Sequence, residues 1–498
     1  MKKYLFILLL LSNFAVAEEE KKPEQKDEKK LIEEVSETEG SVRINGKEIP
    51  YKAKAGTLIL KDDEGKDKAS VFYIAYTRED ISNKSKRPIT YCFNGGPGSS
   101  AIWLHIGTFG PRRAVLSDEG HSIPPYQLVD NAQSILDLTD LVFIDPVSTG
   151  YSRPAPGEDP KQFHGVEEDI KSVGEFIRLY TTRNNRWESP KFIAGESYGT
   201  TRAAGLAEHL QDEEMFYVDG LILLSTALNF QTILDNEGGN DLPYILFLPT
   251  YAATAHYHKK LPSDLQKKPL KTLLKEVEQF AQTDYAVALL QGNQLQGAER
   301  DKIVKQVARY TGLSPEYVER SDLRVKMLRF GKELLRDEKR LVGRFDGRIT
   351  GIDNNPCLDK MDCDPSANVM MGGFTAAFNH YVRSELKWEK DEPYRVIANV
   401  WPWDFGKAKN QYLNVADSLK NAMARNQHLH VFVGNGCYDL ATPYLATEYT
   451  FSHLGVDPSL MNRVRMEYYD AGHMMYTHKP SLEKLKKDLT RFLKDTVQ

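Results

Sequence analysis

Ser197 is the first residue whose surroundings suggest chemistry. It lies in the stretch KFIAGESYGT, between Gly195 and Gly199, after a mostly apolar run and before an alanine-rich amphipathic stretch. In a sharp turn from strand to helix, side chains at both glycine positions would collide with neighbouring backbone, and the serine points out at the end of a sheet. The pattern predicts an exposed nucleophile at a helix N-terminus, and its alternative is an ordinary tight turn.

A serine hydroxyl is a weak nucleophile, so it needs a base and a group that orients this base. LHVFVGNGCYDLATP puts Asp439 just after an apolar strand-like run, and EYYDAGHMMY puts His473 after an aromatic run. The order Ser, Asp, His is that of the α/β hydrolases. We expect His473 to accept the Ser197 proton, and Asp439 to fix the His473 tautomer and stabilise the imidazolium.

The stretch FNGGPGSS, which follows the apolar run ITYCF, is rich in glycine. Consecutive glycines let backbone N–H groups approach a substrate closely. This favours an oxyanion hole formed by the N–H groups of Gly96 and Tyr198. A phosphate-binding loop is the rival interpretation, but the lysine and the Ser/Thr of that motif are missing.

Alternating strands and helices must position these residues. The apolar runs are ITYCF (89–93), LVFID (141–145), KFIAG (191–195), LILLS (221–225) and LHVFV (429–433). Apolar residues recur at helical spacing within 166–180, 203–210 and 482–492. This alternation predicts an α/β protein with a central, mostly parallel sheet flanked by helices. Sites of such sheets lie beyond the carboxyl ends of the strands.

The alternation is interrupted once. About two hundred residues, mostly helix-like, separate LILLS from LHVFV, which is too long for a single crossover helix. We expect a mainly helical cap at 236–400, inserted between two parts of the core at 41–235 and 401–498. β-prone runs around Asn45-Gly46 predict antiparallel strands at the start of the core.

The first 40 residues are expected to lie outside the core. Residues 1–17 have two lysines, an apolar run and an Ala15-Val16-Ala17 cleavage site, the layout of a secretory signal. The apolar run is too short to span a bilayer, so a membrane anchor is the weaker alternative. Residues 18–40 are dense in both charge signs and predict a flexible, solvated tether rather than a packed helix. We expect cleavage after Ala17 and export to the periplasm or the exterior, without stable membrane insertion.

Composition limits the partners. Apolar residues make up 41% and charged residues 27% of the 498, as in ordinary globular proteins, and the net charge is −5. No basic stripe is visible, so nucleic acid is not an expected partner. A local bridge between Cys357 and Cys363 is plausible in an exported protein, whereas Cys92 and Cys437 are expected to be buried. No metal or organic cofactor is expected, and the oligomeric state stays open.

Taken together, NGGPGSS, GESYG, AGH and the spacing from Asp439 to Pro443 resemble the serine carboxypeptidase family, and PVSTGYS (146–152) is similar to that family's PVGTGFS. The resemblance implies an α/β-hydrolase fold and hydrolysis of the C-terminal bond of peptides through an acyl-enzyme. It also implies that Asn94 and Glu196 bind the terminal carboxylate of the substrate. Glu196 can do so only when it is protonated or shares a proton, because two carboxylates repel each other.

The chain departs from the family pattern in several places. The family has a second glutamate where this chain has Thr108, so half of its carboxylate-binding pair is missing. Ser99 replaces the family's cysteine, so that its usual disulfide cannot form. Asn435 and Ile144 each stand where the family has an aspartate. Strict exopeptidase action and a strongly acidic optimum therefore do not follow from the resemblance.

We interpret the chain as a secreted serine carboxypeptidase that acts on the C-termini of peptides or proteins. An esterase or acyltransferase with the same triad is an alternative, because the triad does not distinguish an ester from an amide. A secreted binding protein without activity is a third, but all three triad positions are filled.

Overall fold

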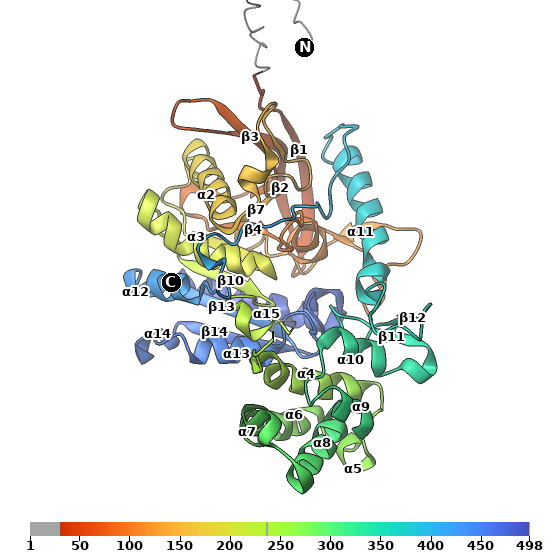
Figure 1. The fold of residues 1–498 in the computed structure, drawn as a ribbon. Coiled ribbons are helices and arrows are strands. Elements are labelled where there is room, and N and C mark those ends of the chain that lie inside the picture. The colour runs from red at the N-terminus through yellow and green to blue at the C-terminus, as the bar shows by residue number, and fades with distance from the viewer. Residues whose placement is uncertain (1–29, 236–237, 498) are drawn as a thin grey trace, which may run out of the picture.

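A mixed β-sheet runs through the molecule in the computed structural model, which describes residues 30–235 and 238–497 (Figure 1). The sheet has ten strands. The strand order is β1-β2-β3-β7-β4-β9-β10-β13-β14, and β8 pairs with β3. The strands of this sheet are β1 (Val35–Ile44), β2 (Lys47–Lys61), β3 (Asp67–Arg78), β4 (Ile89–Phe93), β7 (Asp140–Ile144), β8 (Arg153–Pro154), β9 (Lys191–Glu196), β10 (Gly220–Leu224), β13 (His430–Gly436) and β14 (Val464–Tyr469). From β7 to β14 all pairs are parallel, which confirms the predicted α/β class.

Each of the five apolar runs forms a strand because both faces of the sheet are covered. In β9, Ile193 packs in one core, whereas Phe192 and Ala194 pack in the other. One face is covered by α2 (Val166–Arg183), α3 (Tyr198–Glu214) and α12 (Ala416–Arg425), and the other by α11 (Pro365–Ser384) and α15 (Lys479–Thr496). The helical spacing of 166–180, 203–210 and 482–492 is confirmed by α2, α3 and α15.

The N-terminal strands differ in part from expectation. Asn45 and Gly46, with φ of 50° and 78°, form the predicted turn between β1 and β2. The predicted tether at 18–40 is wrong for residues 35–40, which belong to β1 and pair with β2. Charged side chains of β1 point outward on alternate positions, so that a charged segment still forms an edge strand. The predicted signal at 1–17 and the tether residues 18–29 lie outside the described residues.

Helices dominate the long segment between β10 and β13. They are α4 (Leu242–Tyr257), α5 (Ser263–Gln266), α6 (Leu270–Phe280), α7 (Ala286–Gln291), α8 (Gly297–Thr311), α9 (Pro315–Arg320), α10 (Met327–Glu333), α11 and α12. In the same segment, β11 (Arg340–Val342) pairs with β12 (Thr350–Ile352). Most of these helices share a core of their own and project from one end of the molecule, in green in Figure 1. Residues 395–398 return to the sheet region through bridges to Ser99 and Gly150.

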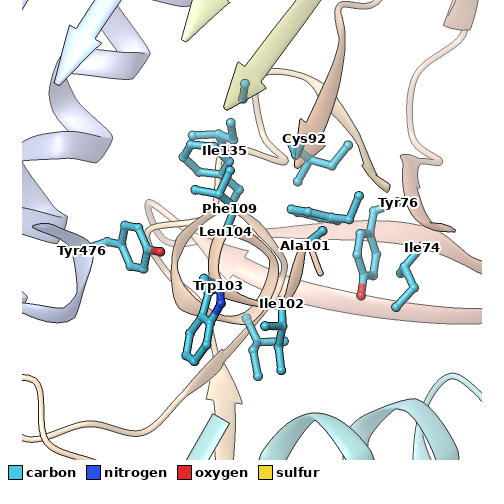
Figure 2. Close-up of a cluster of buried hydrophobic side chains, with 14 of the residues drawn as sticks. Ile74, Tyr76, Cys92, Ala101, Ile102, Trp103, Leu104, Phe109, Ile135 and Tyr476 are labelled. Carbon is cyan, nitrogen blue, oxygen red and sulfur yellow. The ribbon is translucent and has the colours of Figure 1, made fainter. Parts of the chain in front are cut away.

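Buried side chains also surround the turn formed by α1 (Ile102–Leu104) and the π-helical turn η2 (His105–Phe109). Figure 2 shows Trp103 and Leu104 on this turn, with Tyr476 reaching toward it from the C-terminal part of the chain. Tyr476 belongs to η9 (Met475–Thr477), between β14 and α15. The turn therefore packs against the C-terminal part of the chain. The remaining elements are the small pair β5 (Arg112–Ala114) and β6 (Leu128–Asp130), with α13 (Tyr444–Ser452) and α14 (Pro458–Met461).

The four cysteines are unpaired. The plausible bridge between Cys357 and Cys363 is not formed, since both are free and Cys357 is exposed. Cys92 and Cys437 are buried, as expected. Across 30–235 and 238–497, no helix combines the length and the apolar character needed to cross a bilayer.

An ion cluster ties the amino ends of the central strands together. Asp140, the first residue of β7, accepts hydrogen bonds from Arg87 Nε (2.7 Å) and Arg186 Nη1 (2.6 Å). All three side chains are buried. Removing the shared carboxylate would leave two buried guanidinium groups without their anion, which is costly.

We expect Asp140→Asn to lower the free energy of unfolding by roughly 3–5 kcal/mol, because it breaks two buried ion pairs at once. Chemical denaturation of the wild-type and variant chains measures this difference. The matched control is Asp264→Asn, which breaks an exposed pair with Arg309 and should leave the denaturation midpoint unchanged. Equal midpoints for the wild type and both variants would show that the buried cluster does not stabilise the fold.

Candidate active site

Four parallel strands deliver the predicted site residues to one edge of the sheet. Asn94 follows β4, Ser197 follows β9, Asp439 follows β13 and His473 follows β14. The carboxyl ends of parallel strands meet at the same edge, which is where open α/β sheets hold their ligands. Residues far apart in the sequence thus come together here.

Ser197 stands on the turn between β9 and α3, with φ of 59° and ψ of −130°. Its N–H donates to the carbonyl of Leu224 (3.0 Å), and its own carbonyl accepts from the N–H (2.8 Å) and Oγ1 (2.7 Å) of Thr200. A Cβ on Gly195 would lie 2.2 Å from the carbonyl oxygen of Gly199. These hydrogen bonds hold Ser197 in a backbone conformation that a serine rarely adopts. Because of the close approach to Gly199, only glycine fits at position 195.

Asp439 and His473 form a buried pair. The Nδ1 atom of His473 and Oδ2 of Asp439 are 2.7 Å apart, and both side chains are almost fully buried. Asp439 Oδ1 accepts from the N–H groups of Ala441 (2.8 Å) and Thr442 (2.9 Å), and Oδ2 from Thr442 Oγ1 (2.7 Å). The carboxylate is thereby fixed, and it holds the proton of His473 on Nδ1, which leaves Nε2 as the acceptor.

The ring of His473 is also positioned by the inserted segment. The ring stacks on Phe345 with ring centroids 5.1 Å apart, and the backbone N–H of His473 donates to the Phe345 carbonyl (2.5 Å). The backbone carbonyl of His473 accepts from Ser225 Oγ (2.6 Å). A Cβ on Gly472 would lie 2.2 Å from the Phe345 carbonyl oxygen, so the AGH motif needs glycine for this close approach. Phe345 has no signal in the sequence that would have placed it here.

The electrostatics suit a base. Burial alone would lower the pKa of His473, but the charge and the hydrogen bond of Asp439, together with the charge of Glu196, raise the pKa above its ordinary value. A higher pKa makes the imidazole a stronger proton acceptor.

A cavity of about 130 Å³ opens between the nucleophile and the base. Ser197 and His473 both line it, with Asn94, Glu196 and Gly96. The hydrogen bonds of the described residues include none between the Ser197 hydroxyl and His473, and such contacts often tighten only when substrate binds. Within the described part of the chain, no three His, Cys, Asp or Glu side chains are grouped as metal ligands would be.

The glycine-rich loop is fastened to the helix that Ser197 begins. Arg202, buried in α3, donates to the carbonyl of Asn94 (2.7 Å) and to Asp169 Oδ2 (2.7 Å). Gly96 lines the cavity, and Tyr198 is the first residue of α3. The two backbone groups predicted for the oxyanion hole therefore flank Ser197 from the loop and from the helix.

Asn94 and Glu196 form a pair at the cavity wall. β4 and β9 pair Phe93 with Gly195, so the next residues, Asn94 and Glu196, lie side by side where the two strands end. Asn94 Nδ2 donates to Glu196 Oε1 (3.1 Å). Burial raises the pKa of Glu196 to about 7, so that its carboxyl is neutral below that pH.

Tyr476 stands beside this pair and was not predicted. The buried Oε2 of Glu196 and Oη of Tyr476 each lack a well-aligned hydrogen bond, although the hydroxyl is close enough to influence the pKa of Glu196. Thr108 is buried in η2 and does not line the cavity; a Cβ on the neighbouring Gly107 would lie 2.6 Å from the Tyr476 ring. Figure 2 shows Tyr476 pointing at this turn. The sequence signal that could have placed Tyr476 near the site is its position three residues after His473.

A mixed sheet with helices on both faces, and a serine on the turn from β9 to α3, defines an α/β-hydrolase fold. The family model described as serine carboxypeptidase matches residues 45–486, and this chain belongs to that family. The resemblance expected from NGGPGSS and GESYG is thus confirmed.

Two curated relatives come from Arabidopsis thaliana. Serine carboxypeptidase-like 20 is 26% identical over 246 residues, which are 48% of this chain and 43% of that protein. Serine carboxypeptidase-like 34 is 27% identical over 203 residues, which are 38% of this chain and 37% of that protein. The chain therefore spans less than half the length of these relatives.

Among solved structures, Kex1(delta)p, a prohormone-processing carboxypeptidase from Saccharomyces cerevisiae, superposes with a TM-score of 0.56 at 16% identity. The match covers 89% of this chain and 92% of that one. At this identity the likeness shows the fold.

We expect Gly195→Ala to reduce the rate at which a fluorophosphonate reagent labels Ser197 by about a hundredfold, because the new methyl group displaces the turn. The labelling is followed by mass spectrometry under native conditions. Gly372→Ala is the matched control, since it adds a methyl group in the middle of α11 where nothing lies within 4 Å. Equal labelling of both variants would refute the steric argument.

Proposed function

We propose that this protein is a serine carboxypeptidase that removes residues from the C-termini of peptides through Ser197, His473 and Asp439. One observation carries the proposal: Ser197 and His473 line one cavity, and the Asn94–Glu196 pair forms its wall. The cavity thus offers a nucleophile and a base next to a group suited to a terminal carboxylate. Family membership supports the same reaction.

The proposed reaction passes through an acyl-enzyme. His473 Nε2 takes the proton from Ser197 Oγ as this oxygen attacks the carbonyl carbon of the last peptide bond. The N–H groups of Gly96 and Tyr198 stabilise the oxyanion. His473 then gives the proton to the leaving amine, and the C–N bond breaks to leave an acyl-enzyme. Water, deprotonated by His473, attacks the ester and releases the shortened peptide and the free serine.

Glu196 and Asn94 recognise the terminal carboxylate in this proposal. A neutral Glu196 donates its O–H to the substrate carboxylate, and Asn94 holds Glu196 in place. Ionised Glu196 would repel the same carboxylate. The raised pKa of Glu196, about 7, allows this recognition to persist toward neutral pH.

The remaining predictions stay part of the proposal. Residues 1–17 would direct export and be cleaved after Ala17, which puts the enzyme in the periplasm or outside the cell. The helical segment 236–400 would serve as the cap that shapes the cavity, and Phe345 supports this by packing on His473. Peptide or protein C-termini would be the substrates.

We expect Ser197→Ala to abolish peptide hydrolysis while the circular dichroism spectrum stays that of the wild type, because only one oxygen is removed. Unrelated peptides are incubated with each protein, and the products are followed by mass. The wild type should give ladders shortened from the C-terminus. Internal cuts, or activity of the alanine variant at the wild-type rate, would contradict the proposal. A blocked dipeptide compared with its ester analogue separates a peptidase from an esterase.

We expect Glu196→Gln to remove the pH dependence of KM for a substrate with a free C-terminus. In the wild type, Glu196 ionises as pH rises through about 7. The KM of the wild-type enzyme should therefore increase by about tenfold per pH unit above that point. Glutamine stays neutral, so the KM of the Glu196→Gln variant should not change with pH. The same peptide with a C-terminal amide is the control, since it carries no charge to repel. A wild-type KM that is constant from about pH 6 to about pH 8 would exclude this role of Glu196.

A further inference from the structure

Arg344 brings a positive charge into the proposed active-site cavity. It lies in the inserted segment, next to Phe345, and it lines the cavity with Ser197 and His473. Its guanidinium group is close enough that its charge counters the rise in the pKa of His473. The charge therefore acts at the place where a substrate would react.

The guanidinium group of Arg344 has no anionic partner among residues 30–235 and 238–497. The guanidinium carbon lies 5.2 Å from the centroid of the Phe345 ring. Two carboxylates belong to neighbouring residues. Asp346 binds Arg348 (2.7 Å), and Asp364 Oδ1 accepts from Ser366 Oγ (2.5 Å) and from the backbone N–H of Arg344 (3.0 Å). Asp364 Oδ2 is buried without a hydrogen bond and forms no ion pair with the guanidinium group. The charge is thus left for something that enters the cavity.

The surroundings favour an anionic ligand. Much of the remaining wall is apolar, with Met370, Met371 and Ile397. Glu196 is neutral below pH of about 7, because burial raises its pKa to about 7, so it does not cancel the positive charge there. A half-buried cation beside apolar side chains gains most from a partner that brings its own negative charge.

We propose that Arg344 is a specificity-determining residue that binds a carboxylate of the substrate next to the scissile bond. The inference rests on the proposed function and adds a substrate class to it. The carboxylate has two sources: the free C-terminus, or an acidic side chain on the residue that precedes the cleaved bond. Both offer the planar pair of oxygens that a guanidinium group binds with two hydrogen bonds.

An arginine also offsets the loss of the second acid. Thr108 stands where the family resemblance implies a glutamate, and it lies outside the cavity wall. A pair of acids binds a carboxylate only while protons are present, whereas arginine stays charged at all relevant pH values. Recognition through Arg344 therefore does not need an acidic medium.

The test compares Arg344→Gln with the wild type on four blocked peptides that share one scissile bond. One pair differs in a free C-terminal carboxylate or a carboxamide. The other pair differs in Glu or Gln before the cleaved bond. The matched control is Arg340→Gln, the same change on an exposed residue of β11 outside the cavity. The measured quantity is kcat/KM for each protein and peptide.

In each pair of peptides, only one peptide carries the carboxylate that Arg344 would recognise. We expect Arg344→Gln to lower kcat/KM for that peptide by about ten- to a hundredfold, because the variant loses a charge-assisted hydrogen bond. The other peptide of the pair should be cleaved as by the wild type. Loss confined to the free C-terminus assigns the terminal carboxylate, and loss confined to Glu assigns the side chain. Arg344→Lys should recover part of the loss, because it restores charge without the planar fork. Arg340→Gln should match the wild type.

Equal loss on all four peptides, or none, overturns the role of Arg344. This outcome differs from a failure of the proposed function, in which the wild type itself cleaves no peptide. Succinate and succinamide test binding of a carboxylate without peptide turnover. Succinate should slow fluorophosphonate labelling of wild-type Ser197 more than succinamide does. This difference should vanish in Arg344→Gln. A difference that persists in the variant also refutes the inference.

Discussion

The tight backbone packing around Ser197 controls the geometry of the whole site. A side chain at Gly195 would overlap the carbonyl of Gly199, so the end of β9 and the start of α3 hold a single arrangement. Arg202 then fastens the loop after β4 to the same helix. The nucleophile, the proposed oxyanion groups and the Asn94–Glu196 pair are consequently one rigid unit, and the strained φ of Ser197 is maintained by the hydrogen bonds around it.

The base reaches this unit from a different part of the chain. Asp439 and His473 follow the two last strands of the sheet, and Phe345 from the inserted segment supports the imidazole. The core therefore supplies the groups proposed for bond cleavage, while the insertion supplies Phe345, Arg344 and methionine side chains along the wall. Substitutions in the insertion can change which substrates fit without altering the proposed nucleophile, base or oxyanion groups.

The sequence revealed those features that depend on local pattern. Buried strands such as β4 and β10 are short, continuous apolar runs, and the glycines around Ser197 mark a steric need that any such turn has. Residues that meet only through the fold were missed: Tyr476 reaches the α1–η2 turn, and Arg344 reaches the cavity, from positions with no motif of their own. Residues 35–40 were misjudged because an edge strand tolerates charge on its exposed side, where Glu37 and Glu39 lie.

The insertion also separates the proposed nucleophile from its base in time. Ser197 is made before the helical segment, and Asp439 and His473 are made after it. A chain that has been made only through β9 and α3 therefore carries the proposed nucleophile without its proposed base. Synthesis of β13 and β14 is thus the step that completes the proposed site, because Asp439 and His473 follow these two strands.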